Sequence, residues 1–181
     1  MARKETISRD AIMQAAFLIL LEEGIGQVTA RKLAARANCS TQPIFRVYRN
    51  MEEVMEELFE TACSFFQDYC RKFPGQSETP FVNLGQAYIT FAGEHKKVFE
   101  FIFLSPERFG KSMYDIINGS EGCISKEVQA ALSHGCKDAE NLFVKIWIYV
   151  HGAACMRFTG DYDLSEEETT QALRAAYYSF R

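Results

Sequence analysis

Residues 28–54 constrain this chain more than any other segment, because they predict two short helices joined by a tight turn and followed at once by a third helix. Thr29 is a good N-cap for the first helix, and apolar residues follow it at helical spacing. Asn38 can take the left-handed conformation that ends a helix. Asn50, with Glu53 three residues later, resembles a capping box and predicts the start of the third helix.

The second of these helices is predicted to have two different faces. Ser40 can cap it, and Pro43 falls in its first turn, where a missing N–H costs little. Ile44 and Tyr48, four residues apart, are predicted to point inward. The outward positions are mostly polar and include two arginines: Thr41, Gln42, Phe45, Arg46 and Arg49. A helix pair of this kind is typical of a helix-turn-helix that enters the major groove of DNA.

At these residues the chain resembles the tetracycline-repressor (TetR) family of bacterial transcription regulators. The resemblance covers roughly the first third of the chain and rests on Ile12, Ala15, Ala16, Gly24, Val28–Arg31 and Ala37–Val54. The family usually shows Ala-Gly-Val-Ser before the recognition helix, then a Leu-Tyr-x-His-Phe core and a Lys-Glu-Glu-Leu start to the fourth helix. The corresponding positions here are Ala37–Ser40, Ile44–Tyr48 and Met51–Val54.

Three departures from the family pattern affect the expected contacts with DNA. Phe45 lacks the hydroxyl that the family's Tyr offers to a phosphate, Val47 replaces a polar His, and Met51 replaces a Lys. Each departure removes a contact with the DNA backbone. Either the affinity for DNA is lower than in the family, or Arg46, Arg49 and the N-terminal arm compensate for the lost contacts.

The resemblance implies a role for each outward residue. Thr41, Gln42 and Arg46 lie on the outer, N-terminal half of the recognition helix and are expected to face base edges. Contacts with the backbone or the minor groove are expected from Thr29, Arg31, Phe45, Arg49 and the arm residues Arg3 and Lys4. The alternative is a pair of core helices that resembles a helix-turn-helix and has no role in DNA binding.

The charge distribution supports a nucleic-acid partner independently. Residues 1–50 contain eight Lys or Arg and four acidic residues, which gives this segment a net charge of +4. Because the whole chain carries −4, residues 51–181 carry −8. A basic head on an acidic body is typical of a phosphate-binding module. No basic amphipathic helix accompanies it, so an anionic membrane is not expected as a partner.

Length and composition predict an all-α protein. The chain has 181 residues, 48% of them hydrophobic, and only four prolines, so it can bury a core and has little room for long linkers. Segments that alternate with period two are sparse, whereas helix-period patterns are found almost throughout, and no internal repeat is present. We expect a DNA-binding domain over residues 1–50 and a helical ligand-binding and dimerisation domain over residues 51–181.

The N-terminus and the cysteines both favour a cytoplasmic protein. Arg3 and Lys4 precede the uncharged run Ala11–Leu21, which could be mistaken for a secretory signal, but Glu22 and Glu23 follow it directly. The six cysteines are scattered, with no Cys-x-x-Cys and no His at metal-ligand spacing. We expect reduced, mostly buried thiols. A thiol sensor formed by Cys63 and Cys70 on one helix face is the alternative.

Beyond residue 50 the pattern predicts helices separated by short breaks. The expected segments are Glu52–Lys72, Pro80–Lys96, a short aromatic stretch Val98–Leu104, a helix from Ser105 towards Asn118, Ser120–Ser133, Asp138–Phe158 and Ser165–Phe180. Trp147–Gly152 also resembles the Trp-x-x-x-His-Gly signature of one group of TetR C-terminal domains. The TetR resemblance implies that this half holds a ligand pocket and a dimer interface.

Aromatic side chains are the candidate lining of that pocket, because such residues can wall an apolar cavity between helices. The expected lining residues are Phe65, Phe66, Tyr69, Tyr88, Phe91, Phe103, Tyr114, Trp147 and His151. The alternative for each is ordinary core packing. The expected ligand is a small apolar or aromatic effector, whose binding displaces the fourth helix and lowers DNA affinity, as the resemblance implies.

The last two helices are the expected dimer interface, since a two-fold symmetric operator requires a two-fold symmetric protein. An apolar stripe on each helix predicts a four-helix bundle. The stripes are Leu142, Ile146, Tyr149, Ala153 and Met156 on one helix and Leu173, Ala176, Tyr177 and Phe180 on the other.

The sequence gives no reason to expect an enzyme or a cofactor. No Ser or Cys stands at a recognisable spacing from a base, and no metal cluster or phosphate-binding glycine loop is found. The sequence therefore predicts a ligand-responsive transcriptional repressor that acts as a homodimer. A constitutive DNA binder or protein-interaction module without a small effector is the alternative.

Overall fold

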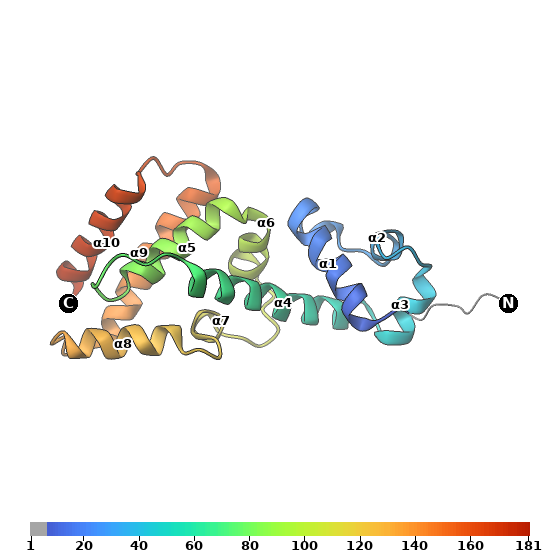
Figure 1. The fold of residues 1–181 in the computed structure, drawn as a ribbon, viewed down its shortest axis with the longest axis horizontal. Helices are drawn as coiled ribbons and strands as arrows, with labels where there is room; N and C mark the ends of the chain where they lie inside the picture. The colour runs from blue at the N-terminus through green and yellow to red at the C-terminus, as the bar shows by residue number, and fades with distance from the viewer. Residues whose placement is uncertain (1–6) are drawn as a thin grey trace. The chain divides into compact units, whose positions relative to one another are not determined.

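The computed structural model of this protein describes residues 7–181, and every regular element in that range is helical (Figure 1). The chain forms two compact units. The first contains the residues up to Ser64 together with Lys97–Gly110, and the second contains Phe65–Lys96 and Lys111–Arg181. These units differ from the division at residue 50 expected from the sequence.

The first unit contains the N-terminal helices and a segment that returns to them later in the chain. Its elements are α1 (Arg9–Glu23), a 3₁₀ turn (Ile25–Gln27), α2 (Ala30–Arg36), α3 (Thr41–Val47), the first part of α4 (Met51–Lys72), most of α6 (Lys96–Phe99) and a π-helical segment (Glu100–Leu104). The rings of Phe59 on α4 and Phe101 pack edge to face with centroids 5.4 Å apart. The returning segment therefore completes the core of this unit.

Local capping explains where the first helices begin and end. The hydroxyl of Thr29 accepts a hydrogen bond from the Lys32 backbone N–H, and Asn38 has φ +51°, as expected for the residue that ends α2. Ser40 has the extended N-cap conformation, but its side chain accepts no capping hydrogen bond. Asn50 Oδ1 accepts from the Glu53 N–H at 2.9 Å. The reciprocal bond differs from a standard capping box, because the Glu53 carboxylate accepts from the N–H of Arg49.

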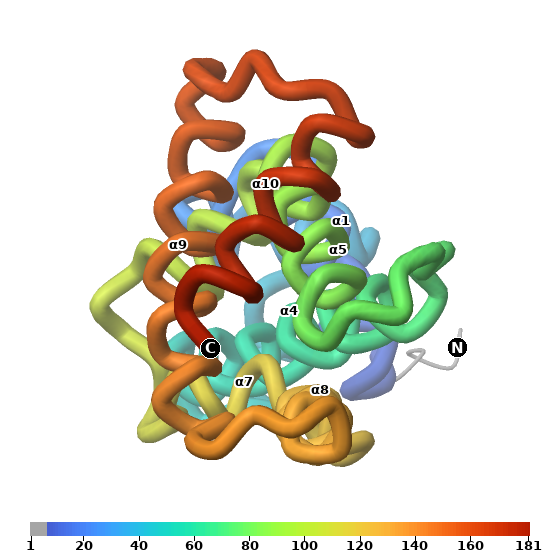
Figure 2. The backbone as a smooth tube through the Cα atoms, turned by 90° about the vertical axis from the view of Figure 1, so that its left-hand side faces the viewer, coloured from blue at the N-terminus to red at the C-terminus, as the bar shows by residue number. Residues whose placement is uncertain are grey.

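The second unit is built on three helices that pack against one another. α5 (Val82–Glu94) contacts both α9 (Ala139–Thr159) and α10 (Glu166–Phe180), and these two also contact each other (Figure 2). α7 (Met113–Asn118) and α8 (Cys123–Ser133) pack together, and α8 also contacts α9. Gly85 permits the close approach of α5, because a Cβ there would lie 3.2 Å from side-chain atoms of Leu173 and Val150.

Three helices begin later than the sequence predicts, in each case after backbone with positive φ; one is α8, which begins at Cys123 and not at Ser120, after Gly122 with φ +66°. The helix expected from Ser105 towards Asn118 begins only at Met113, since Phe109 and Gly110 have φ of +49° and +77°. α5 begins at Val82 because Phe81 has φ +66°, and its N–H donates to the carboxylate of Glu127 on α8. Over residues 7–181 no helix combines the length and the hydropathy needed to cross a bilayer.

Candidate functional site

The helix-turn-helix in the first unit presents one polar face. Ile44 on α3 and Tyr48 directly after it are 0% and 1% exposed and fill the core, whereas Thr41, Gln42 and Arg46 on α3 are exposed. Phe45 is 46% exposed, although burying an aromatic ring of this size would be favourable. The second helix of the pair therefore offers four adjacent side chains to a partner.

The cationic side chains of α2 and α3 differ in whether they form ion pairs within the protein. Lys32 forms an ion pair with Glu23, and Arg36 Nη2 lies 2.6 Å from Glu22 Oε1. The hydrogen bond to Glu22 raises the pKa of Arg36 and lowers the pKa of Glu22. These two cations are held by the protein itself and are less available to DNA.

Three other arginines remain available to an anionic partner. Within residues 7–181, Arg31, Arg46 and Arg49 have no ion-pair partner, and all three are exposed. Thr29 is also exposed, and its hydroxyl can still donate a hydrogen bond while it accepts from Lys32. Arg3 and Lys4, the expected arm residues, lie outside the described residues.

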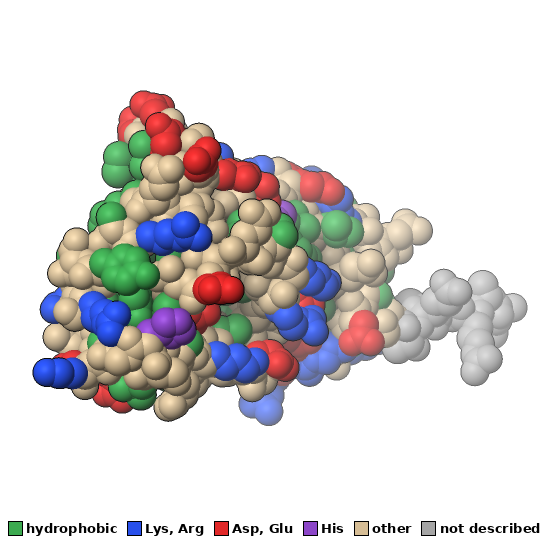
Figure 3. All heavy atoms as spheres, turned by 60° about the vertical axis from the view of Figure 1, so that its left-hand side comes forward, with side chains coloured by type: hydrophobic (Ala, Val, Ile, Leu, Met, Phe, Trp, Pro, Cys, Tyr) green, Lys and Arg blue, Asp and Glu red, His purple; other side chains and the backbone are tan. Residues whose placement is uncertain are grey.

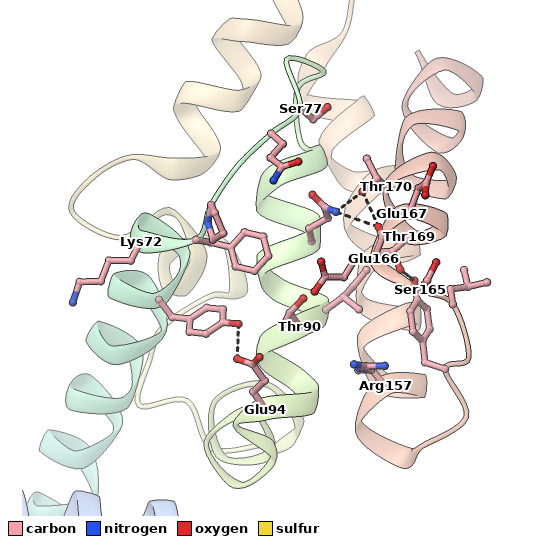
Figure 4. A pocket seen from close by; sticks show the side chains of 18 of the residues that line it. Lys72, Ser77, Thr90, Glu94, Arg157, Ser165, Glu166, Glu167, Thr169 and Thr170 are labelled. Carbon is pink, nitrogen blue, oxygen red and sulfur yellow. Dashed lines mark hydrogen bonds between the residues drawn. The ribbon is translucent and has the colours of Figure 1, made fainter.

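The second unit contains a cleft with a volume of about 1390 Å³ (Figure 4). The outer face of α5 forms its floor. One wall comes from the end of α4 and the loop that follows, and the other comes from α10 and the loop before it. Phe65, Tyr69 and Phe73 make the first wall aromatic, whereas the wall from α10 is polar.

Several polar groups in the cleft hold one another in place. The Tyr69 hydroxyl donates to the Glu94 carboxylate at 2.8 Å, and Gln86 donates to the hydroxyl of Thr170. Burial and the bond to Glu94 raise the pKa of Tyr69. Arg157 extends into the cleft and has no ion-pair partner in the described chain. Its Nε lies where a Cβ on Gly93 would approach within 2.9 Å, so the glycine makes room for the guanidinium.

Solved structures match almost the whole chain. A TetR-family protein from Vibrio parahaemolyticus is 16% identical, with a TM-score of 0.67 over 94% of this chain and 96% of its own. A TetR-like transcriptional regulator from Rhodococcus sp. RHA1 is 15% identical, with a TM-score of 0.62 over 97% and 96% of the two chains. A TetR-family protein from Rhodococcus sp. gives 16% identity and a TM-score of 0.65 over 95% and 97%.

The fold is that of the TetR regulators. No protein-family model and no curated protein sequence matches the chain. The all-α prediction is confirmed, and so is the TetR-like fold that the resemblance implied.

Within this TetR fold, the residues expected to line a ligand pocket do not form one cavity. Phe66, Tyr88 and Phe91 are buried in the second unit, and Tyr88 and Trp147 line a cavity of about 20 Å³, which has room for about one water molecule. Phe65 and Tyr69 line the large cleft instead. The remaining three are placed differently: Tyr114 is 45% exposed, His151 accepts or donates a hydrogen bond with the Tyr88 hydroxyl, and Phe103 belongs to the first unit.

The residues expected at the dimer interface are mostly part of the subunit core. Leu142, Ile146, Leu173, Ala176 and Tyr177 are at most 7% exposed, so a partner would gain little surface from them. The exposed apolar side chains on these helices are Val144, Ile148, Tyr149 and Met156 on α9 and Tyr178 on α10. The exposure of Val144 and Ile148 could not be predicted, because apolar residues occupy nearly every face of α9 and periodicity cannot separate its two sides.

Acidic side chains of the second unit cluster at one of its ends. Acidic side chains cluster at the top of Figure 3, at the height of the α9–α10 connection, which carries Asp161, Asp163 and the first turn of α10. In that turn Ser165 and Glu168 form a capping box, which lowers the pKa of Glu168. No three His, Cys, Asp or Glu side chains in residues 7–181 are grouped so that they could hold a metal ion.

Proposed function

We propose that this protein is a sequence-specific DNA-binding transcriptional regulator, acting as a repressor. The proposal rests on the exposed side of α3. Gln42 and Arg46 are both exposed there, and Arg46 has no ion-pair partner among the described residues. Arg and Gln are side chains that recognise guanine and adenine by paired hydrogen bonds in the major groove. The TetR-like fold supports the same function.

In the proposed complex, Thr41, Gln42 and Arg46 contact base edges. Arg31 and Arg49 contact phosphates, and their charges remain free for this purpose. Thr29 donates its hydroxyl hydrogen to a phosphate, and Phe45 packs against sugar or a thymine methyl group. The phosphate contacts position the helix, and the base contacts select the sequence.

A homodimer provides the second recognition helix. One helix-turn-helix buries too little surface for tight specific binding, and a two-fold dimer matches a palindromic operator. Ile148 and Met156 are 67% and 49% exposed on α9, and Tyr178 is 64% exposed on α10, so these helices offer a partner an apolar surface. A Cβ added at Gly152 would meet nothing from the surrounding elements within 4 Å, so this position leaves room for a second helix to approach closely.

A small effector regulates the protein through the cleft of the second unit. The interior beside Tyr88 has space for about one water molecule, so the effector binds in the cleft. The aromatic wall and Arg157 suit an aromatic molecule with a negatively polarised substituent. To regulate, the effector must bind the released conformation more tightly than the DNA-bound one. The alternative is a constitutive binder, in which the cleft has no ligand.

The DNA-binding function is tested by selecting binding sites from random double-stranded DNA with the full chain. The expected product is a near-palindrome with half-sites about 34–36 Å apart, or a multiple of that spacing. Arg46→Ala should lose about 1–3 kcal/mol and relax selection at one position of each half-site. Arg71→Ala is the matched control, because Arg71 lies on α4 in the second unit and pairs with Asp68.

Two results decide between the candidates. Failure to enrich any sequence, with folded protein, would refute the DNA-binding function. Effector control is tested with a panel of aromatic acids, monitored by melting temperature and operator binding, in the wild type and in Arg157→Ala. If no compound changes either quantity, the constitutive binder replaces the ligand-responsive regulator.

A further inference from the structure

The floor of the cleft in the second unit separates two charges of opposite sign. The Glu94 carboxylate accepts the hydrogen bond from Tyr69 on α4, whereas a Cβ on the preceding Gly93 would lie 2.9 Å from Arg157 Nε on α9. Glu94 therefore faces the α4 side of the cleft, and the Arg157 guanidinium lies on its α9 side (Figure 4). Neither side chain has an ion-pair partner within residues 7–181, and both are exposed.

A second carboxylate approaches the same side of the cleft from a different element. Glu166 is the first residue of α10 and lines the cleft, and its backbone carbonyl lies 3.4 Å from Nε2 of Gln86 on α5. Burial contributes most to the raised pKa of Tyr69, and the charges of Glu94 and Glu166 raise this pKa further. Both carboxylates therefore act on the space in front of the Tyr69 hydroxyl. Two negative charges around one space favour a cation there.

Aromatic rings form the wall beside these carboxylates. Phe65, Tyr69 and Phe73 are spaced by four residues and therefore lie on one side of the chain. The ring centroids of Tyr69 and Phe73 are 6.0 Å apart, and those of Phe65 and His95 are 4.9 Å apart. Burial lowers the pKa of His95, although Glu94 opposes the shift, so this ring is mostly neutral at pH 7. The wall can stack with a flat ring and attract a cation over a ring face.

This inference rests on the proposed effector role of the cleft. We propose that the cleft binds a free aromatic α-amino acid, with its ammonium group between Glu94 and Glu166, its carboxylate on Arg157 and its ring on the aromatic wall. The guanidinium can bind the ligand's carboxylate through two parallel hydrogen bonds. An aromatic acid without an ammonium group would satisfy Arg157 and leave both glutamates without a cation.

Other charged groups around the cleft do not offer the same pair of contacts. Asp68 already forms an ion pair with Arg71, with 2.6 Å between Oδ1 and Nη2. The side chain of Lys72 extends away from the cleft (Figure 4). Arg174 donates a hydrogen bond from Nε to the Ser77 hydroxyl at 3.3 Å. Glu94, Glu166 and Arg157 therefore define the charge pattern that a ligand meets.

The site remains accessible in the proposed dimer. Ile148, Met156 and Tyr178 offer the exposed apolar surface of α9 and α10, and none of these three residues lines the cleft. Arg157 follows Ile148 by nine residues, which places it about half a turn away around α9. A partner subunit on the Ile148 side therefore leaves Arg157 free to bind a ligand.

The test compares three probes on the full chain by titration calorimetry at pH 7. L-Phenylalanine carries both charges, 3-phenylpropanoate lacks the ammonium group, and 2-phenylethylamine lacks the carboxylate. The Kd of L-phenylalanine should be about 10-fold lower than that of either analogue, since a hydrogen bond to a charged group contributes roughly this much.

Two variants assign the charges of the ligand to the two sides of the cleft. Glu94→Gln keeps an acceptor for the Tyr69 hydroxyl, and it should weaken L-phenylalanine about 10-fold while leaving 3-phenylpropanoate unchanged. Arg157→Gln should weaken L-phenylalanine to the same extent and leave 2-phenylethylamine unchanged. Asp68→Asn is the matched control, because it removes a carboxylate that is paired with Arg71, and it should preserve the preference for L-phenylalanine. Melting temperatures verify that each variant is folded.

The outcomes separate this inference from the proposed effector role. If 3-phenylpropanoate binds as tightly as L-phenylalanine, or if Asp68→Asn loses as much as Glu94→Gln, the inference is overturned and the cleft remains a site for aromatic acids. Binding of none of the three probes overturns the inference as well. Operator binding in the presence of L-phenylalanine reports the regulatory role separately. An unchanged operator affinity with L-phenylalanine bound would support the site and refute its role in regulation.

Discussion

Arg9 on α1 donates a 2.6 Å hydrogen bond from Nε to the carboxylate of Glu57 on α4, and so links the first helix of the first unit to the helix that follows α3. The same guanidinium lies 4.6 Å from the centroid of the Tyr48 ring, directly after α3. Burial, followed by the charge of Glu57, raises the pKa of Tyr48 to about 12. One exposed cation on α1 therefore contacts both the residue directly after α3 and the helix that follows it.

Arg9→Ala should loosen the placement of α3 with little effect on overall stability. The ion pair is largely exposed and screened by water, so the melting temperature should change only slightly. Operator affinity should fall several-fold, because α3 must be positioned for its base contacts. Arg9→Lys keeps the charge without the planar contact on Tyr48 and should recover only part of the affinity. Unchanged affinity in Arg9→Ala would show that the link does not position α3.

Arg49→Ala should weaken DNA binding without changing its sequence preference. Arg49 is exposed after α3, and we propose that it contacts a phosphate. Loss of one such contact should reduce the slope of log affinity against log salt by about 1. The measurement is a salt titration of operator and random DNA. Loss of discrimination between the two DNAs would instead place Arg49 at a base.

Ile148→Asp should convert the proposed dimer into a monomer that remains folded. Ile148 is 67% exposed within one subunit, so the charge is harmless to the subunit and costly at an apolar interface. Operator affinity should fall on the order of 100-fold, since two linked half-sites no longer bind together. Leu132→Asp on α8, where Leu132 is 43% exposed, is the matched control. Light scattering distinguishes the outcomes, and a dimeric Ile148→Asp protein would exclude this surface.

Glu127 should make stability fall as pH rises from acid towards neutrality. Burial raises the pKa of its carboxyl, although the N–H of Phe81 opposes the shift. Between the ordinary Glu pKa of about 4.3 and the raised value, the folded state binds more protons than the unfolded state, so stability is lost as pH rises through this window.

Two substitutions at Glu127 separate its charge from its hydrogen bond. Glu127→Gln keeps an acceptor for Phe81 and should abolish this part of the pH dependence. Glu127→Ala leaves the Phe81 N–H without its partner and should cost about 1–3 kcal/mol at every pH. Urea unfolding at pH 4–8 measures both. A wild type and a Glu127→Gln protein with parallel pH profiles would contradict the assignment.

The helix-turn-helix could be predicted from the sequence because its signals are local. Thr29 and Asn50 accept the predicted capping hydrogen bonds, and Asn38 has the predicted left-handed conformation. The start of α5 could not be predicted, since Phe81 depends on Glu127, 46 residues away in the chain. The lining of the cleft could not be predicted from the sequence either. Aromatic residues at helical spacing have the same pattern whether they fill a core, as Phe66 does, or line a cleft, as Tyr69 does.

The first unit is assembled from two separate stretches of chain, with Phe101 from the later stretch packed on Phe59 from the earlier one. A fragment that ends at residue 64 would lack Phe101 and expose Phe59 to water, and a fragment that ends at residue 50 would lack both rings. The first unit is therefore not a continuous segment that a single crossover could transplant with its core intact.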